Sequence, residues 1–330
     1  MKSVQSVYPG IIRIRLPMPG KKPGPVNVYL FKGSDNVALI DTGTFMASWL
    51  LKRRLADLGV GFADIDQIIL THGHLDHQGG VKAIARHNRR QLRVCAHRDE
   101  IPAIQAGQDA PLRAYGRFLT STGTPLRYRL AILVMMFWGQ RFTRACRVNQ
   151  PLEDGDLLKL GDYEAEVVAT PGHTRGSISL FLKKEGLLFS GDHILGHITP
   201  NALPMFERDS ILPVRQSQKE YFDSLETIAR LDPKIICPAH GRRINDFEKV
   251  HRIYRDCFTQ RQTLILSTVR KEPWQSIYMI ARKLFPHIHG RAFVLDLFLA
   301  MSEIFTHLQV LEAEGLAQLE EENGILKIGA

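Results

Sequence analysis

The segment Thr71-His72-Gly73-His74-Leu75-Asp76-His77 carries three histidines and one aspartate at His-x-His-x-Asp-His spacing. Imidazole nitrogens and carboxylate oxygens are ligands for zinc, iron and manganese. The segment follows residues 65–70, an apolar run typical of a short buried strand. Ligands at the end of a strand are held rigidly beside an open edge, so this spacing predicts a catalytic metal site. A histidine-rich surface loop would explain one pair of histidines, but not four ligand-type side chains.

Three further candidate ligands, His173, Asp192 and His240, also follow apolar runs typical of strands. Any one of them alone would be interpreted as a hydrogen-bonded structural residue. Together they repeat one arrangement, in which a short buried strand delivers a His or Asp to the same rim. We therefore expect them to join the histidine-rich segment at one metal site.

Three other polar residues near these runs are candidates for supporting roles. Asp41 ends an apolar run and is either a carboxylate that fixes the tautomer of a ligating histidine or an Asx-turn residue before Gly43. His193 follows Asp192 directly and is either a hydrogen-bond donor to a substrate oxygen or a packing histidine. The same two interpretations apply to His197.

Taken in order, these motifs resemble those of the metallo-β-lactamase superfamily over roughly residues 8–250. The resemblance implies an α/β fold, an αββα sandwich with two metal ions at the edge between two mixed sheets. It also implies a ligand set for each ion. The first ion would be held by His72, His74 and His173. The second would be held by Asp76, His77 and His240, and Asp192 would bridge the two.

The chemistry implied by two such ions is hydrolysis. Two divalent ions, zinc by expectation with iron or manganese as alternatives, can share a hydroxide and polarise a substrate oxygen. Asp76 is the candidate catalytic residue that orients this hydroxide and carries a proton to the leaving group. No side-chain nucleophile is needed, so Ser190 is interpreted as a strand-end residue. The four cysteines form no close pair, which favours a reducing compartment.

An insertion at about residues 98–150 departs from a compact version of this fold. It contains two predicted helices, Ala110 to Leu119 and Arg127 to Phe142, and it has eight arginines against three acidic residues, a net charge of +5. The cluster at residues 135–138 makes it apolar as well as basic. It is interpreted as a helical lid over the metal site, as a dimer interface or as an ordinary packed helical pair, and a membrane-surface helix is a further possibility.

The C-terminal block, residues 255–330, resembles the winged-helix domain appended to one branch of the superfamily. Helical spacing covers Pro273 to Phe285 and Arg291 to Glu314, and residues 316–328 form a hairpin with an Asn-Gly turn. From Arg261 onward there are seven basic and eight acidic residues, a net charge of −1. Because a phosphate backbone needs a basic face, nucleic acid is not the expected partner.

These patterns predict a catalytic domain over residues 1–254, with the helical insertion, and a winged-helix-like domain over residues 255–330. No export signal and no membrane-spanning run are recognised, so a cytoplasmic protein, and by default a homodimer, is expected. The expected function is hydrolysis of an ester, thioester or lactone with an acyl or aromatic part and an anionic group. The alternatives are a phosphodiesterase or endoribonuclease of the same fold, and a non-catalytic metal- or ligand-binding regulatory protein. Hydrolysis of β-lactams is not expected.

Overall fold

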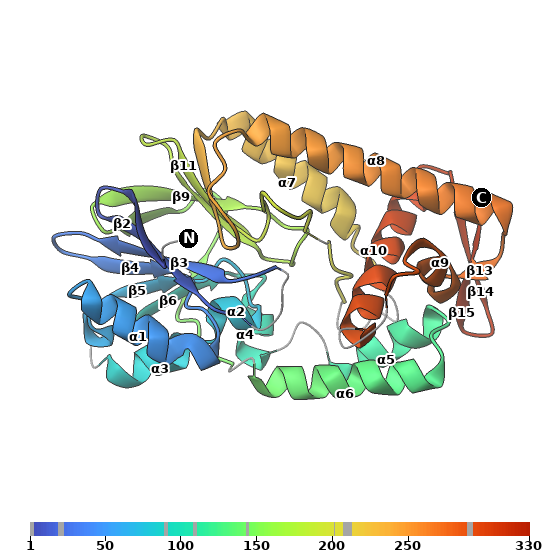
Figure 1. Cartoon of the computed structure of the whole chain (residues 1–330), viewed down its shortest axis with the longest axis horizontal. Helices are drawn as coiled ribbons and strands as arrows, with labels where there is room; N and C mark the ends of the chain where they lie inside the picture. Colours follow the sequence, from blue (N-terminus) through green and yellow to red (C-terminus); the bar gives the residue numbers. More distant parts are fainter. Residues whose placement is uncertain are drawn as a thin grey trace. The chain divides into compact units, whose positions relative to one another are not determined.

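The computed structural model describes residues 3–18, 23–88, 92–107, 111–142, 145–200, 202–206, 213–288 and 293–330. The chain forms two compact units (Figure 1). The first unit comprises residues 1–109, 140–200 and 224–248, and the second comprises residues 110–139, 201–223 and 249–330. The expected helix starts at Ala110 and Arg291 lie outside the described residues.

A seven-stranded sheet forms one half of the first unit. Its strands follow chain order: β1 (Val4–Tyr8), β2 (Ile11–Leu16), β3 (Val26–Lys32), β4 (Val37–Ile40), β5 (Gln67–Ile69), β6 (Arg93–His97) and β7 (Gln150–Leu152). From β1 to β4 neighbouring strands are antiparallel, and from β4 to β7 they are parallel. The parallel strands direct their carboxyl ends to a single edge.

A five-stranded sheet forms the other half. Its order is β12 (Ile235–Pro238), β11 (Leu187–Gly191), β10 (Ile178–Leu182), β9 (Tyr163–Ala169) and β8 (Leu157–Leu160). Strands β8 to β11 are antiparallel, whereas β12 joins β11 in parallel. The carboxyl ends of β11 and β12 therefore also lie at a common edge.

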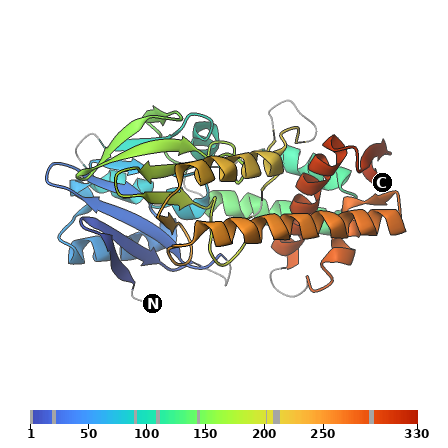
Figure 2. The ribbon, with the colours of Figure 1, turned by 90° about the horizontal axis from the view of Figure 1, so that it is seen from above.

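The two sheets pack face to face over an apolar core. Phe31, Leu180 and Phe189 are among its fully buried side chains, and the rings of Phe31 and Phe189 meet edge to face at 5.2 Å. Helices α1 (Ser48–Asp57) and α3 (Val81–His87) cover the outer face of the seven-stranded sheet (Figures 1 and 2). From Ser224 onward, α7 (Ser217–Leu231) covers the other sheet, and Ser224 Oγ donates a hydrogen bond to the Pro171 carbonyl oxygen. The expected αββα sandwich is confirmed.

The second unit is built mainly from helices around its own core. Its elements are α5 (Leu112–Ser121), α6 (Leu126–Phe142), α8 (Phe247–Lys271), β13 (Gln275–Ser276), α9 (Ile277–Leu284), α10 (Phe293–Ala313), β14 (Gln318–Glu322) and β15 (Ile325–Gly329). The core joins Phe118 and Ile132 of the insertion to Ile280 and Leu308 of the C-terminal helices. Residues 110–139 are therefore grouped with the C-terminal helices, whereas the sequence prediction places them in the catalytic domain.

The C-terminal elements follow the order helix, strand, helix, helix and hairpin, and β15 pairs with both β13 and β14. The Asn-Gly turn lies where expected, with φ of +53° at Asn323 and +76° at Gly324. The helix expected from Pro273 begins later, at Ile277. Ser276 caps it by accepting a hydrogen bond from the Met279 amide, and the preceding residues enter the sheet. The winged-helix interpretation, the domain boundary at residue 254 and the lid stay predictions.

Helix α10 is long and apolar enough to cross a membrane by length and composition alone, with a mean hydropathy of 1.4. The sequence prediction overlooked it because charged residues interrupt the apolar run. Of that apolar window, 61% is buried inside the protein, as in the core helix of a compact domain. The side chains of Met301, Ile304 and Leu308 are fully buried in the second unit's core.

Candidate metal centre

The candidate ligands stand where strands of the first unit end. Asp41 follows β4 and His72 follows β5, and these strands are parallel neighbours. Asp192 and His240 follow β11 and β12, which are parallel neighbours in the other sheet. Ligands gather at the carboxyl ends of parallel strands because the backbone there opens into loops on a fixed base. His173, which follows β9, completes the group.

Glycines allow the loops to approach one another closely. Gly191 has φ of +52°, and a Cβ at this position would lie 2.9 Å from Cβ of Thr71, so no larger residue fits without a shift. A Cβ on Gly80 would lie 2.6 Å from the Thr42 carbonyl oxygen. Thr42 in turn donates its amide and its hydroxyl to the His77 carbonyl oxygen, at 2.8 and 2.7 Å. The loops after β4, β5 and β11 are thereby interlocked.

The first group of donor atoms comes from His72, His74 and His173. His74 Nδ1 lies 2.9 Å from His72 Nε2 and 3.3 Å from His173 Nε2. Around a tetrahedral zinc with bonds of 2.0–2.1 Å, two nitrogen ligands would be about 3.3 Å apart. The three nitrogens therefore converge as the ligands of one ion would.

The second group comes from Asp76, His77 and His240, all of them buried. His240 Nε2 lies 3.3 Å from Asp76 Oδ2, and His77 Nε2 lies 3.8 Å from Asp76 Oδ1. Asp192 adjoins both groups, because its Oδ1 is 3.4 Å from His240 Nε2 and its Oδ2 is 3.8 Å from His173 Nε2. A carboxylate in this position is suited to join two ions.

Three buried atoms of this cluster show that the residues fit the metal ions that the resemblance implies. His77 Nε2, His240 Nε2 and Asp192 Oδ1 are buried and make no hydrogen bond with any residue in the described part of the chain. A buried polar atom without a partner costs about 1–3 kcal/mol. A divalent cation among these atoms would satisfy all three, and imidazole with carboxylate is a donor set that zinc, iron and manganese accept.

The electrostatics of the cluster also favour a cation. Burial raises the pKa of Asp192, but the neighbouring His240 and His77 outweigh it and hold this pKa well below its usual range. Burial lowers the pKa of His77, but the surrounding carboxylates raise it well above the ordinary value. His72, in contrast, has its pKa held well below normal by burial and by the nearby histidines, so its ring is neutral and free to bind a metal.

Asp41 contacts His77 directly. Its Oδ2 lies 2.8 Å from His77 Nδ1, and its Oδ1 accepts a hydrogen bond from the Thr71 amide at 2.9 Å. A carboxylate on Nδ1 fixes the ring so that Nε2 faces the cluster. This geometry agrees with the tautomer-fixing interpretation of Asp41, whose backbone has φ of +60°.

Glu100 is a buried residue at the site that sequence reasoning missed. Its Oε1 accepts a hydrogen bond from the Gly73 amide at 2.9 Å, and its Oε2 accepts from the Gly176 amide at 2.8 Å and from Thr174 Oγ1 at 3.1 Å. Glu100 thus ties the loop of His72 and His74 to the loop of His173. The available signal was the pair of acids Asp99-Glu100, which by itself indicates nothing specific.

His193 and His197 lie differently from the ligands. His193 is 1% exposed, and burial, followed by the charge of His173, lowers its pKa to about 3, so its ring is neutral. Such burial favours the packing interpretation over contact with a substrate. His197 Nε2 lies 2.8 Å from the Pro23 carbonyl oxygen, and its ring lies against Gly241, directly after His240. His197 therefore packs on the loop that carries a candidate ligand.

Comparison with known proteins places this geometry in a family. The profile of the Metallo-beta-lactamase superfamily matches residues 22–240, and the chain belongs to this superfamily. As a member with this fold, it is a metallo-hydrolase. A solved structure of a metallo-beta-lactamase family protein from Thermus thermophilus is similar with a TM-score of 0.82 and 25% identity, covering 98% of this chain and 99% of that chain.

Two curated relatives show how far the similarity extends. A Bacillus subtilis (strain 168) protein named "Probable metallo-hydrolase YqjP" is 31% identical over 312 residues, 92% of each chain. The acyl-coenzyme A thioesterase MBLAC2 of Homo sapiens is 32% identical over 176 residues, which are 50% of this chain and 57% of that protein. The second similarity is thus confined to part of each protein.

Proposed function

We propose that the protein is a dinuclear metal-dependent hydrolase of carbonyl substrates, with acyl thioesters as the first class to consider and esters and lactones as the next. The observation that carries this proposal is the pair of donor groups that meet at Asp192. The partial likeness to an acyl-coenzyme A thioesterase supports a thioester substrate. Zinc is the first candidate metal, and iron and manganese suit the same ligands.

Each candidate residue has a stated part in this proposal. His72, His74 and His173 would hold one ion, Asp76, His77 and His240 the other, and Asp192 would contact both. When bound, two divalent ions lower the pKa of water toward neutrality and polarise the substrate carbonyl. Asp41 holds the ring of His77 in its tautomer, and Glu100 holds the two histidine-bearing loops together.

Asp76 is the candidate for proton transfer. Burial raises its pKa, but His77 and His240 outweigh burial, so the net shift is downward and the group is a carboxylate. As a carboxylate it can accept a proton from the attacking water and deliver it to the leaving group. Asp76 is 7% exposed, whereas His72, His77 and His240 are fully buried.

The four cysteines agree with a reducing compartment, in which we place the protein. Cys95, Cys146 and Cys237 are buried and unpaired, and Cys257 is exposed and unpaired. Burial raises the pKa of Cys95 to about 11 and that of Cys146 to about 12. Both thiols are therefore neutral and unsuited to act as nucleophiles.

A hydrolysis panel on metal-loaded protein tests the proposal, with Asp76→Asn as the blank and Asp57→Asn, an exposed change on α1, as the matched control. The panel contains acyl-coenzyme A thioesters, simple and acyl-homoserine lactones, aryl esters, a bis-aryl phosphate and single-stranded RNA. Turnover of carbonyl substrates that Asp76→Asn abolishes and Asp57→Asn preserves is expected. Cleavage of the phosphodiester or RNA alone would replace the proposal with a nuclease function. Full activity of Asp76→Asn with unchanged metal content would remove the role of Asp76.

A further inference from the structure

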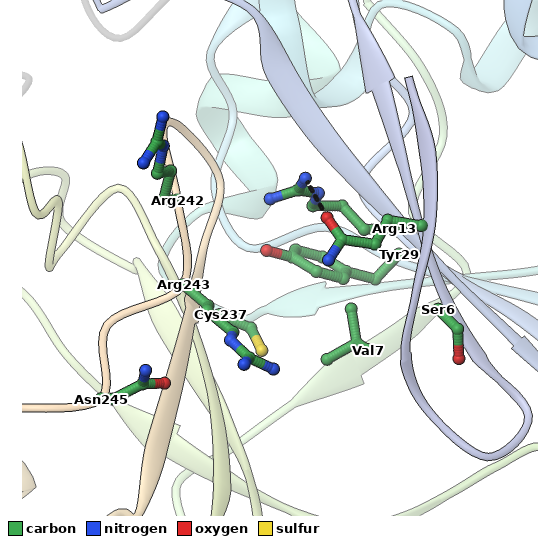
Figure 3. Close-up of a pocket in the computed structure, with 9 residues that line it drawn as sticks. Ser6, Val7, Arg13, Tyr29, Cys237, Arg242, Arg243 and Asn245 are labelled. Atoms are coloured by element: carbon green, nitrogen blue, oxygen red, sulfur yellow. Dashed lines mark hydrogen bonds between the residues drawn. The ribbon is translucent and has the colours of Figure 1, made fainter. Parts of the chain in front are cut away.

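A cavity of about 330 Å³ in the first unit is lined by basic residues and contains no predicted metal ligand. It lies between the β1–β3 part of the seven-stranded sheet and the segment after β12 (Figure 3). Its lining includes Arg13, Tyr29, Cys237, Arg242 and Arg243. The lining contains three arginines and no acidic residue, so its formal charge is +3. The volume is at the lower end of the range for small-molecule sites, roughly 300–1,000 Å³.

Arg13 is a charged residue on an inner face of the sandwich. It lies two residues after Ile11 on β2 and pairs with Tyr29 on β3, and both Ile11 and Tyr29 belong to the core between the sheets. Because alternate residues of a strand share a face, Arg13 points the same way. Its side chain is 94% buried, since only 6% is exposed.

Only part of the guanidinium of Arg13 has a protein partner. Its Nη2 donates a hydrogen bond to Gln5 Oε1 at 2.8 Å, and within the described residues it makes no ion pair with a carboxylate. A guanidinium has five N–H donors, and within the described residues only Nη2 of Arg13 has a hydrogen-bond acceptor. A buried charge is costly unless it is paired, and an anion in the cavity would pair it.

The opposite wall supplies a second arginine. Ile244 bridges to Ile236 in antiparallel fashion, so residues 242–245 fold back along β12. Figure 3 shows Arg13 and Arg243 extending into the cavity from these two walls, whereas Arg242 extends in a different direction. The two guanidinium groups thus approach one space from opposite sides.

The other groups in the cavity do not supply a balancing negative charge. Tyr29 donates its hydroxyl proton to the Pro238 carbonyl oxygen at 2.7 Å, and burial raises its pKa well above the ordinary value. Burial raises the pKa of Cys237 to about 12, although Arg13 and Arg243 lower it. Both groups are therefore neutral, and the positive charge of the arginines is left for a ligand.

We propose that this cavity binds a small phosphate-bearing anion through the guanidinium groups of Arg13 and Arg243. Arginine forms paired hydrogen bonds with phosphate oxygens. The two positive charges of Arg13 and Arg243 match a doubly charged phosphate better than they match a singly charged carboxylate. The ligand is either inorganic phosphate or a small phosphorylated molecule, held in both cases by the same phosphoryl group. The proposal does not depend on hydrolysis at the metal centre.

Calorimetric titration of the metal-loaded full chain with inorganic phosphate tests this proposal, with chloride at equal ionic strength as the blank. Arg243 is exposed, so Arg243→Gln is expected to preserve the fold and is the main variant, and the exposed change Arg86→Gln on α3 is the matched control. We expect at least a tenfold loss of affinity in Arg243→Gln and in Arg13→Gln, and none in Arg86→Gln. Phosphate should also raise the midpoint of thermal unfolding more in the wild type than in Arg243→Gln.

Arg243 is not a proposed metal ligand, so phosphate bound at the metal centre should keep its affinity in Arg243→Gln, and this separates the outcomes. Binding that is unchanged in Arg243→Gln, or no binding at millimolar phosphate, would overturn the proposal. Methyl phosphate distinguishes the two sources of the ligand. Binding as tight as that of phosphate, or tighter, assigns the site to a phosphorylated molecule. Weaker binding assigns it to free phosphate, provided that Arg243→Gln weakens both.

Discussion

The carboxylate of Asp41 lies 2.8 Å from Nδ1 of His77, and both side chains are buried. This contact joins the end of β4 to the short helix α2 (Leu75–Gln78), which carries His77. It sets the direction of His77 Nε2 toward Asp76 and Asp192, at 3.8 and 3.7 Å. The orientation of one proposed ligand therefore depends on a residue 36 positions earlier in the chain.

Asp41→Asn should lower metal affinity and activity without loss of the fold. Asparagine tolerates the left-handed backbone at this position, where φ is +60°, but it cannot supply a carboxylate to the His77 ring. Loss of such an outer contact costs about 10- to 100-fold in metal affinity or activity. Metal content at graded chelator concentrations measures the effect, and Asp57→Asn is the control. Equal metal retention by both variants would contradict the role given to Asp41.

Glu100→Gln should loosen both histidine-bearing loops. The two oxygens of Glu100 accept three hydrogen bonds, and an amide NH₂ in place of one oxygen would face donors instead. A hydrogen bond to a charged group is worth about 1.5–3 kcal/mol, so we expect destabilisation by about 3 kcal/mol and weaker metal binding. Urea unfolding and metal affinity check this, with the exposed change Glu164→Gln on β9 as control. The role fails if both quantities match those of the control.

The order of motifs resembles that of the metallo-β-lactamase superfamily, and this resemblance allowed the αββα fold to be predicted. It also predicted the grouping of His72, His74 and His173, and His74 Nδ1 lies 2.9 and 3.3 Å from the nearest nitrogens of the other two rings. Glu100 could not be predicted in this way. Its function depends on the backbone amides of Gly73 and Gly176, which lie 27 and 76 residues away in the chain. Nearly every residue has such an amide, so the sequence does not show which amides a carboxylate will bind. The grouping of residues 110–139 with the C-terminal helices could not be predicted either. An apolar helix face indicates that the helix packs against something, but not against which element. The buried Arg13 was missed because a charged residue in a strand is ordinarily expected on the exposed face.

Gly241→Ala should destabilise the loop that carries His240. Gly241 has φ of +83°, and an added Cβ would lie 2.7 Å from His197 Nδ1. Gly155 is a matched control, because it has the same φ of +83° and no atom within 4 Å of the added Cβ. Left-handed backbone strain of about 1–2 kcal/mol is therefore common to both alanine variants. The difference in their free energies of unfolding isolates the contact with His197.

His197→Ala provides the test of that contact. In the His197→Ala background the gap between Gly241→Ala and Gly155→Ala should close, because the added methyl group then has room. If the gap persists, the cost arises elsewhere in the loop and not from His197. Metal affinity should be measured on Gly241→Ala and Gly155→Ala, each with and without His197→Ala. The variants with a lower free energy of unfolding should also bind metal more weakly.

His307 should make the second unit sensitive to acid. Its ring is 4% exposed and packs on Phe258 with 4.8 Å between ring centres, and Nδ1 has no hydrogen-bond partner among the described residues. Burial, followed by the positive charge of Arg261, lowers its pKa to about 3. In the unfolded chain the pKa would be near 6.5, so between about pH 3 and 6.5 the unfolded state binds the extra proton. Stability contributed by the neutral ring is therefore complete above pH 6.5 and declines on acidification.

The expected size of this effect is about 1.4 kcal/mol per pH unit, or about 2 kcal/mol between pH 7 and pH 5. His307→Phe keeps an aromatic ring on Phe258 and removes the titrating group, so it should flatten this part of the profile. Urea unfolding at pH 7, 6 and 5 measures the free energy, and the exposed change His287→Gln is the control. If the His307→Phe profile is as steep as that of the control, the acid sensitivity comes from other groups. His193 is the first of these to examine, because burial lowers its pKa to about 3 as well.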